Sequence, residues 1–309
     1  MMERYENRKL PEVPETIPMG DMPGDIVSVD KSDIERAQTV FRKLIRDISP
    51  VIREYPKRKM VISICGGSGS GKTVISSILS FYLNQVGIGS YTLSGDNYPR
   101  RIPIYNDAER LHIFRENGLL GMIAAGEYTK ERLQRIQEWQ KKEDDANETH
   151  QIEQPWFSYY LKAGRKGLES YLGTDKELEF EELEKIIMQF KEGTPQIWLK
   201  RMGRKPEDLW YDKVDFSNKS VLILEWTHGN SEFLHGVDYP IFLYSTPQET
   251  LSYRQKRNRD HSIDNPFTAL VLDIEQKKLE NQVHKAKLIL SRDGKIISYN
   301  EYKQLIKEA

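Results

Sequence analysis

The sequence predicts an α/β protein with a doubly wound parallel sheet, a helical insertion and an N-terminal helical extension. Three observations support this fold class. Apolar runs typical of buried strands recur along the chain, at residues 60–65, 91–94, 221–225, 241–244 and 286–290. Segments with apolar residues at helical spacing separate these runs, and a glycine-rich loop joins the first strand to the next helix. Apolar strands that alternate with helices indicate a parallel sheet covered on both faces.

The composition fits one large domain or two small ones in a chain of 309 residues. A formal net charge of −1 gives no general attraction to nucleic acid. We expect no membrane partner, because no apolar run approaches the ~20 residues of a bilayer span. The N-terminus lacks the apolar stretch of a signal peptide, and the one cysteine, Cys65, cannot form an internal disulfide. We therefore expect a cytoplasmic protein, and a homodimer is compatible with these features.

The N-terminal extension is predicted at residues 1–56. Residues 1–30 carry prolines and charges with little periodicity, which indicates an extended arm. Ser32 and Glu35 have the spacing of a capping box, and an amphipathic helix follows them.

The glycine-rich loop at residues 66–73 matches the Walker A pattern without a mismatch. Its context is a strand, Met60–Cys65, followed by a helix that we expect to stop at Gly87. Backbone N–H groups of such a loop bind phosphate, and the helix N-terminus adds partial positive charge. Lys72 would contact the β- and γ-phosphates, and Thr73 would ligate Mg²⁺. The predicted ATP-binding residues are Gly66, Gly67, Ser68, Gly69, Ser70, Gly71, Lys72 and Thr73. The fold class is thus a P-loop NTPase-type sheet.

The core is predicted in two parts, at residues 57–129 and 216–309. Residues 130–215 are rich in Gln, Glu, Lys, Trp and Tyr, and they predict a mostly helical insertion between the two parts. In the second part, Thr246 and Glu249 have the spacing of another capping box, and Gly294 turns the chain toward a final helix.

Two carboxylates follow predicted strands, where ligands collect in a doubly wound sheet. Asp96 follows the second strand, and it could accept the proton of an attacking hydroxyl or bind Mg²⁺. The alternative for Asp96 is a structural Asp-Asn turn. Glu225 ends an apolar run at the position of a Walker B acid. The predicted catalytic residues are Lys72 and Asp96, and the predicted metal ligands are Thr73, Asp96 and Glu225.

Arginines cluster just after Asp96 and indicate an acceptor that carries an anionic group. The alternative is that they pair with Asp107, Glu109 or Glu116. His228 continues from Glu225 into the cleft, where a hydrogen-bonding role is favoured over that of a base. The predicted substrate-binding residues are Asp96, Tyr98, Arg100, Arg101, Arg110 and His228, with Arg115 in the same arginine cluster.

The densest basic stretch lies at residues 253–260. A mobile lid with arginines would neutralise a transferring phosphoryl group and exclude water. We expect Arg254, Arg257 and Arg259 to belong to such a lid, and the alternative is a solvated helical surface.

With these residues in place, the chain resembles the phosphoribulokinase/uridine kinase family of P-loop kinases, over roughly residues 57–129 and 216–309. Asp96 matches the catalytic aspartate of that family, and Tyr211-Asp212 is similar to its Tyr-Asp segment. Residues 95–101 also resemble the Gly-Asp-Asn segment of adenylylsulfate kinases. The resemblance implies ATP-dependent phosphorylation of a small-molecule hydroxyl, with ATP and Mg²⁺ as cofactors. It leaves the acceptor open among nucleosides, sugar phosphates and related anionic metabolites.

Three other classes of P-loop protein also contain a Walker A loop. A GTPase requires an Asn/Thr-Lys-x-Asp motif after a late strand, and the sequence has none. The Leu93-Ser94-Gly95 segment is too close to the P-loop to be a transporter signature. A nucleotide-binding regulatory protein without turnover is the class that the sequence excludes least well.

Overall fold

The computed structural model describes residues 10–17, 20–23, 28–55, 57–246, 249–250 and 265–308. The chain forms two compact units. The first draws on Met1–Tyr98, Glu179–Thr250 and Leu279–Ala309, and the second on Pro99–Leu178 and Leu251–Lys278. These bounds differ from those of the segments 57–129, 130–215 and 216–309, whose role as domains stays a prediction.

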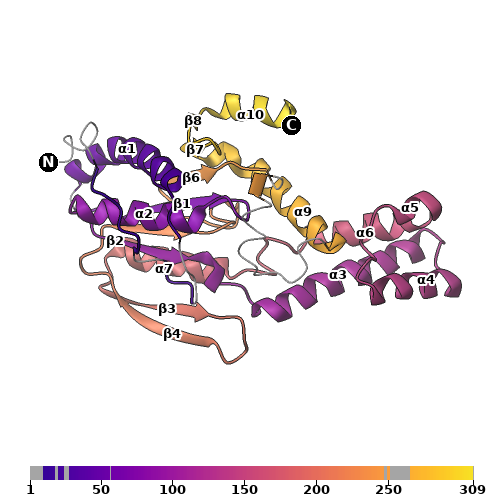
Figure 1. Ribbon diagram of the computed structural model, residues 1–309. Helices are drawn as coiled ribbons and strands as arrows, with labels where there is room; N and C mark the ends of the chain where they lie inside the picture. Colours follow the sequence, from indigo (N-terminus) through magenta and orange to yellow (C-terminus); the bar gives the residue numbers. More distant parts are fainter. Residues whose placement is uncertain are drawn as a thin grey trace. The chain divides into compact units, whose positions relative to one another are not determined.

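A six-stranded sheet forms the centre of the first unit, in the order β2-β5-β1-β6-β7-β8 (Figure 1). Its strands are β1 (Met60–Gly66), β2 (Ser90–Ser94), β5 (Val221–Glu225), β6 (Tyr239–Leu243), β7 (Leu288–Leu290) and β8 (Ile296–Ile297). All neighbours pair in parallel except β7 and β8. The predicted parallel sheet is therefore confirmed. Because the chain builds the β2–β5 side first and then crosses to β6, the end of β1 is a topological switch point, where ligands bind in such sheets.

Side chains of the central strands alternate between two apolar cores, as the period of a β-strand requires. Ile62 and Ile64 of β1 pack with helices α1 (Lys31–Glu54) and α2 (Lys72–Gln85). On the opposite face, Cys65 packs with Phe242 of β6 and with residues of α9 (Pro266–Gln282), η3 (Val283–Lys285) and α10 (Tyr299–Glu308). Burial of each large apolar side chain contributes about 1.5–3 kcal/mol, so this packing holds the helices on the sheet.

Helix α1 begins with a capping box, but not at the predicted residues. The Asp30 carboxylate accepts a hydrogen bond from the Asp33 N–H at 2.8 Å, and the Asp33 side chain accepts one from the Asp30 N–H at 3.5 Å. The prediction of a Ser32–Glu35 box is wrong by two residues. The reason is that the helix already begins at Lys31, and aspartate is as good an N-cap as serine.

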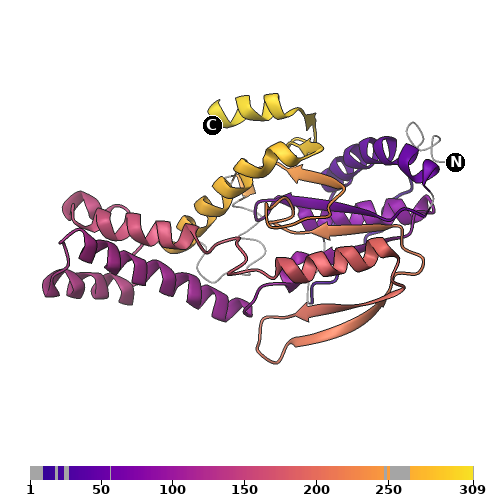
Figure 2. The same cartoon turned by 180° about the vertical axis from the view of Figure 1, so that it is seen from behind.

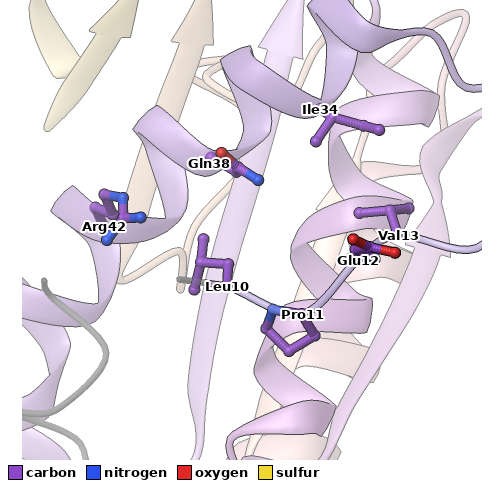
Figure 3. A pocket seen from close by; sticks show the side chains of 7 residues that line it. All are labelled: Leu10, Pro11, Glu12, Val13, Ile34, Gln38 and Arg42. Carbon is purple, nitrogen blue, oxygen red and sulfur yellow. The ribbon is translucent and has the colours of Figure 1, made fainter. Parts of the chain in front are cut away.

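The N-terminal arm packs against the first unit. Leu10 and Ile17 are buried in the core that contains α1 and α2. Figure 3 shows Leu10, Pro11, Glu12 and Val13 beside the α1 side chains around a hollow of about 420 Å³. The α1 residues that line this hollow are Ile34, Gln38 and Arg42. The arm is thus attached to the protein by apolar contacts.

An antiparallel hairpin replaces the end of the predicted helical insertion. Strands β3 (Gln196–Met202) and β4 (Leu209–Asp215) pair after helix α7 (Phe180–Glu192), and all three elements belong to the first unit. Helix α7 lies within the segment that was predicted to be mostly helical. The sequence did not predict these strands, although Ile197 and Leu199 are buried and Trp198 between them is exposed, an alternation typical of a strand.

The second unit is helical. It contains α3 (Pro103–Ala124), α4 (Lys130–Lys141), α5 (His150–Glu153), α6 (Phe157–Glu169) and the first part of α9. Helices α3 and α6 lie side by side in both views (Figures 1 and 2). A Cβ atom at Gly118 would lie 2.6 Å from the Tyr160 ring, and one at Gly164 would lie 2.7 Å from the Phe114 ring. Glycines therefore allow the two helices to approach closely. Over the described residues, no helix combines the length and hydropathy of a bilayer span.

Candidate active site at the P-loop

The Walker A loop joins β1 to α2, as the sequence predicts. Gly71 directly precedes α2 with a φ of 92°, a left-handed conformation that glycine adopts without strain. At Gly66, a Cβ atom would lie 2.5 Å from the Leu243 carbonyl oxygen, so the loop passes directly over the end of β6. The first N–H groups of an α-helix have no intrahelical acceptor, so the start of α2 is suited to binding an anion.

Two buried cations hold the carbonyl oxygens of the loop. The Lys72 Nζ donates to the carbonyl oxygens of Gly66 at 3.1 Å and Gly67 at 3.2 Å. Arg36 of α1 donates from its NH2 to the Ser70 carbonyl oxygen at 3.1 Å. The sequence predicts Lys72 but not Arg36, because the contact of Arg36 depends on how α1 packs on α2. The N-terminal extension therefore contributes to the shape of the P-loop.

Glu225 connects the P-loop to the end of β2. It is the last residue of β5, next to Ser94 of β2 in the sheet register, and only 4% of it is exposed. The Thr73 hydroxyl donates to its Oε1 at 3.3 Å, and the Ser94 hydroxyl lies 3.4 Å from its Oε2. The Ser94 Oγ also accepts a hydrogen bond from the Asp96 N–H at 3.4 Å. Ser94, absent from the predicted site, thus joins two predicted residues, Glu225 and Asp96.

Asp96 lies in a one-turn 3-10 helix, η2 (Gly95–Asn97), which follows β2. Gly95 and Asn97 are buried, whereas Asp96 is exposed. A Cβ atom at Gly95 would lie 2.1 Å from the Trp226 ring, so the turn is seated directly on that ring. The turn is thus packed against Trp226 while its middle residue, Asp96, is exposed.

The chemistry of the donor set fits Mg²⁺. The Thr73 hydroxyl and the Glu225 carboxylate supply the oxygen ligands that this cation prefers. Asp96 adds a further carboxylate, on the turn whose backbone contacts Ser94. In the part of the chain that the structure describes, no group of three or more His, Cys, Asp or Glu residues could hold a metal by itself. Mg²⁺ is usually held by one or two protein oxygens together with waters and substrate phosphates, so Thr73 and Glu225 could hold it without such a cluster.

Tyr98 and His228, predicted as substrate contacts, lie largely inside the first unit. Tyr98 has no exposed surface, and burial raises the pKa of its hydroxyl. His228 is 9% exposed and packs edge-on against Trp226, with ring centroids 5.3 Å apart. Both residues support the turn and strand ends of the site, and their contact with a substrate stays a prediction.

The predicted acceptor arginines belong to the second unit, where carboxylates bind them. Arg110 pairs with the buried Glu177 at 2.6 Å, and also with Asp107 at 3.4 Å and Glu275 at 3.7 Å. Arg101 contacts the Tyr171 hydroxyl at 3.0 Å and Glu109 at 3.5 Å.

Arg115 and Arg100 are engaged within the same unit. Arg115 makes a two-pronged contact with Asp145 at 2.8 and 2.9 Å. Arg100 donates to the Asp175 carbonyl oxygen. Two of the carboxylates that the alternative interpretation named, Asp107 and Glu109, are thus arginine partners, and the cluster is not a free positive surface.

The predicted lid residues Arg254, Arg257 and Arg259 lie outside the described residues, so the lid stays a prediction. Just before them, the predicted capping box at residues 246 and 249 is confirmed. The Thr246 N–H donates to the Glu249 carboxylate at 2.7 Å, and the Glu249 N–H donates to the Thr246 hydroxyl at 3.3 Å.

A buried ion pair that the sequence did not predict lies beside η2, the turn that carries Asp96. Asp21 of the N-terminal arm accepts a hydrogen bond from Arg201 of β3 at 2.9 Å, and their side chains are 7% and 6% exposed. Burial raises the pKa of Asp21 to about 6, against the lowering effect of Arg201 and of hydrogen bonds from Ser94 and Tyr91. No local pattern could reveal a pair that is separated by this much sequence.

Comparisons with known proteins agree with the motif. The adenylylsulphate kinase family model matches residues 58–107. The sequence is 39% identical over 240 residues to a bifunctional alpha-galactosidase/sucrose kinase of Mediterraneibacter gnavus. That match covers 78% of this chain, but the chain spans only about a fifth (21%) of the relative's length.

Solved structures that this chain matches include two of low sequence identity. A phosphoribulokinase from Rhodobacter spheroides is 17% identical with a TM-score of 0.45, over 76% of this chain and 70% of that chain. A possible uridine kinase from Bacillus stearothermophilus is 15% identical with a TM-score of 0.38, over 80% of this chain and 98% of that chain. The Walker A loop and the parallel sheet are thus joined by a match to a kinase family model over residues 58–107 and by similarity to a relative whose name includes a sucrose kinase.

We expect the Asp21→Asn variant to change how stability depends on pH. The pKa of Asp21 in the folded protein is about 6, above its ordinary value of 3.8. The folded protein thus binds this proton more tightly than the unfolded chain does. Protonation of Asp21 therefore adds to the free energy of unfolding below pH 3.8, and this contribution is lost as pH rises through 6. From pH 4 to pH 7, the wild type should lose about 2 kcal/mol of unfolding free energy relative to the variant.

Urea denaturation at several pH values measures this difference. Asp212→Asn, which removes a half-exposed carboxylate that also contacts Arg201, is the matched control. A constant difference between the wild type and Asp21→Asn over this range would contradict the raised pKa.

Proposed function

We propose that this chain is an ATP-dependent kinase that transfers the γ-phosphoryl group to a hydroxyl of an uncharged small molecule such as a sugar or nucleoside. The observation that carries the proposal is the position of Glu225. Its buried carboxylate contacts the Walker A threonine, and it is linked through Ser94 to the turn that bears Asp96. A nucleotide-binding group and a candidate base thereby belong to one connected site.

Each residue of the site has a role in this reaction. The N–H groups of the P-loop would bind the phosphates, and Lys72 would exchange the Gly66 and Gly67 carbonyl oxygens for phosphate oxygens. Thr73 and Glu225 would hold Mg²⁺, which neutralises phosphate charge during transfer. The site thus uses positioning and electrostatics, the main contributions to phosphoryl transfer.

Asp96 is the proposed base. The acceptor oxygen forms a bond to the γ-phosphorus while the bond between that phosphorus and the ADP oxygen breaks. The proton of the acceptor hydroxyl moves to the Asp96 carboxylate. An exposed carboxylate on a rigid turn suits this step, because general-base catalysis requires hydrogen-bond reach of the hydroxyl.

The uncharged acceptor is supported by the arginines of the second unit. Arg101 and Arg110 already contact carboxylates, so they offer little charge to an anionic substrate. The relative from Mediterraneibacter gnavus is described as a sucrose kinase, and sucrose is uncharged. An adenylylsulfate acceptor, suggested by the match to residues 58–107, is the alternative. The cytoplasmic location, the lack of a nucleic-acid partner and a homodimer stay predictions.

We expect Lys72→Ala to weaken ATP binding at least tenfold. The change removes a hydrogen-bonding cation, and such bonds contribute roughly 1.5–3 kcal/mol. Isothermal titration calorimetry with Mg·ATP measures the effect, and Lys57→Ala removes an exposed lysine of the same unit as a control. Wild-type ATP affinity in a folded Lys72→Ala protein would reject this role.

We expect Asp96→Asn to lower kcat by about 10²–10⁴-fold while ATP binding largely survives. The amide keeps the shape of the side chain but cannot accept the proton. Steady-state kinetics with a saturating acceptor measures kcat, with the exposed carboxylate change Glu207→Gln as the control. Full kcat in Asp96→Asn would reduce Asp96 to a turn residue.

We expect uncharged sugars or nucleosides to be phosphorylated in preference to sugar phosphates and adenylylsulfate. The acceptor KM should change less than about twofold in Arg101→Ala, because Arg101 already contacts Glu109 and Tyr171. ATP consumption with a panel of acceptors that includes sucrose measures both. Arg135→Ala, at an exposed arginine of the same unit, is the control. Preference for an anionic acceptor, lost in Arg101→Ala, would refute the uncharged-acceptor proposal and leave the kinase assignment intact.

A further inference from the structure

The buried carboxylate of Asp21 binds both ends of the turn that carries Asp96. Its Oδ1 accepts hydrogen bonds from the Ser94 N–H at 2.6 Å and from the Asn97 side-chain amide at 3.2 Å. Ser94 directly precedes the turn, and Asn97 is its last residue. An N-terminal residue therefore fixes the backbone of a segment that follows β2.

The other oxygen of the same carboxylate faces the hairpin and β2. Its Oδ2 accepts hydrogen bonds from Arg201 at 2.9 Å and from the Tyr91 hydroxyl at 3.0 Å. Arg201 also donates to Tyr91 at 2.9 Å and to Asp212 at 3.1 Å. One Asp21 oxygen therefore binds the turn, and the other binds Arg201 and Tyr91.

The hairpin holds the turn from a second direction. The Asn97 Oδ1 accepts a hydrogen bond from the Met202 N–H at 3.0 Å, at the end of β3. Both polar ends of the Asn97 side chain are therefore used, one by the N-terminal arm and one by the hairpin. This arrangement sets the position of the turn more tightly than the Trp226 contact alone, because hydrogen bonds have direction.

We infer that Asp21 is a positioning residue for catalysis, which fixes the turn so that Asp96 and the Ser94–Glu225 contact keep their geometry. The inference rests on the proposed function for its kinetic consequence. Its structural consequence, the local rigidity of residues 94–97, can be measured without turnover. A merely structural role for Asp21 predicts loosening of the whole first unit instead.

Asp21→Asn tests the inference, because an amide offers one acceptor oxygen where the carboxylate offers two. Either the turn or Arg201 must then face an NH₂ group. The matched control is Asp212→Asn, which removes another carboxylate partner of Arg201, one that lies on strand β4 of the hairpin. The readouts are amide hydrogen exchange of residues 94–97, ATP affinity by calorimetry, and kcat.

We expect exchange at residues 94–97 to speed up about tenfold or more in Asp21→Asn, with exchange of β1 and α2 unchanged. The kcat should fall about tenfold, while ATP affinity and the acceptor KM stay within twofold. Asp212→Asn should leave all of these near wild type. If Asp21→Asn does not fold, Tyr91→Phe removes a hydroxyl bound to both Asp21 and Arg201 and should show the same pattern with smaller amplitude.

Unchanged exchange at residues 94–97, or equal acceleration throughout the first unit, would overturn the inference. So would an unchanged kcat with a loosened turn, or the same effects in Asp212→Asn. If the wild type proved to have no kinase activity, the exchange result would still decide whether Asp21 positions the turn. The failure of the proposed function is thereby distinguishable from the failure of the inference.

Discussion

The site depends on bringing the carboxyl ends of β1, β2 and β5 to one edge of a parallel sheet. This arrangement places the Walker A loop, the Asp96 turn and Glu225 together although they are far apart in sequence. Glu225 is buried, and a buried carboxylate is costly unless hydrogen-bonded. The hydroxyls of Thr73 and Ser94 meet that requirement, so the sheet register and the polar contacts of the site support each other.

The parts that sequence predicted well are those whose determinants are close together in the chain. The Walker A pattern spans eight residues, and it correctly predicted β1, the loop and α2. Short apolar runs likewise predicted β5 and β6. The hairpin of β3 and β4 was missed because a composition rich in Gln, Glu and Lys was read as helical. The apolar run Ile197-Trp198-Leu199, which contains two residues that favour strands, was the available signal for a strand.

Charge clusters were the least reliable guide, and the arginines after Asp96 show why. A run of arginines indicates an anion site only if no carboxylate of the protein binds them first. The carboxylate that binds Arg110 most closely is that of Glu177, which is 67 residues later in the chain. Only the packing of the helical unit brings the two together, so the sequence left both interpretations open and the structure favours internal pairing.

The same reasoning applies to Asp21 and Arg201, whose pairing needs an explanation other than stability. Replacing a buried ion pair by well-packed apolar residues is often neutral or stabilising, because the desolvation of two charges is costly. An apolar residue at position 21 would, however, leave the Ser94 N–H and the Asn97 amide without the acceptor that they now share. Unsatisfied buried donors cost about 1–3 kcal/mol each. A carboxylate at this position satisfies donors from β2, the turn and the hairpin at once, and Arg201 keeps it ionised at neutral pH. The pair therefore matters mainly because its hydrogen bonds fix the position of the turn. In an active site, even a small displacement of a reacting group lowers the rate strongly.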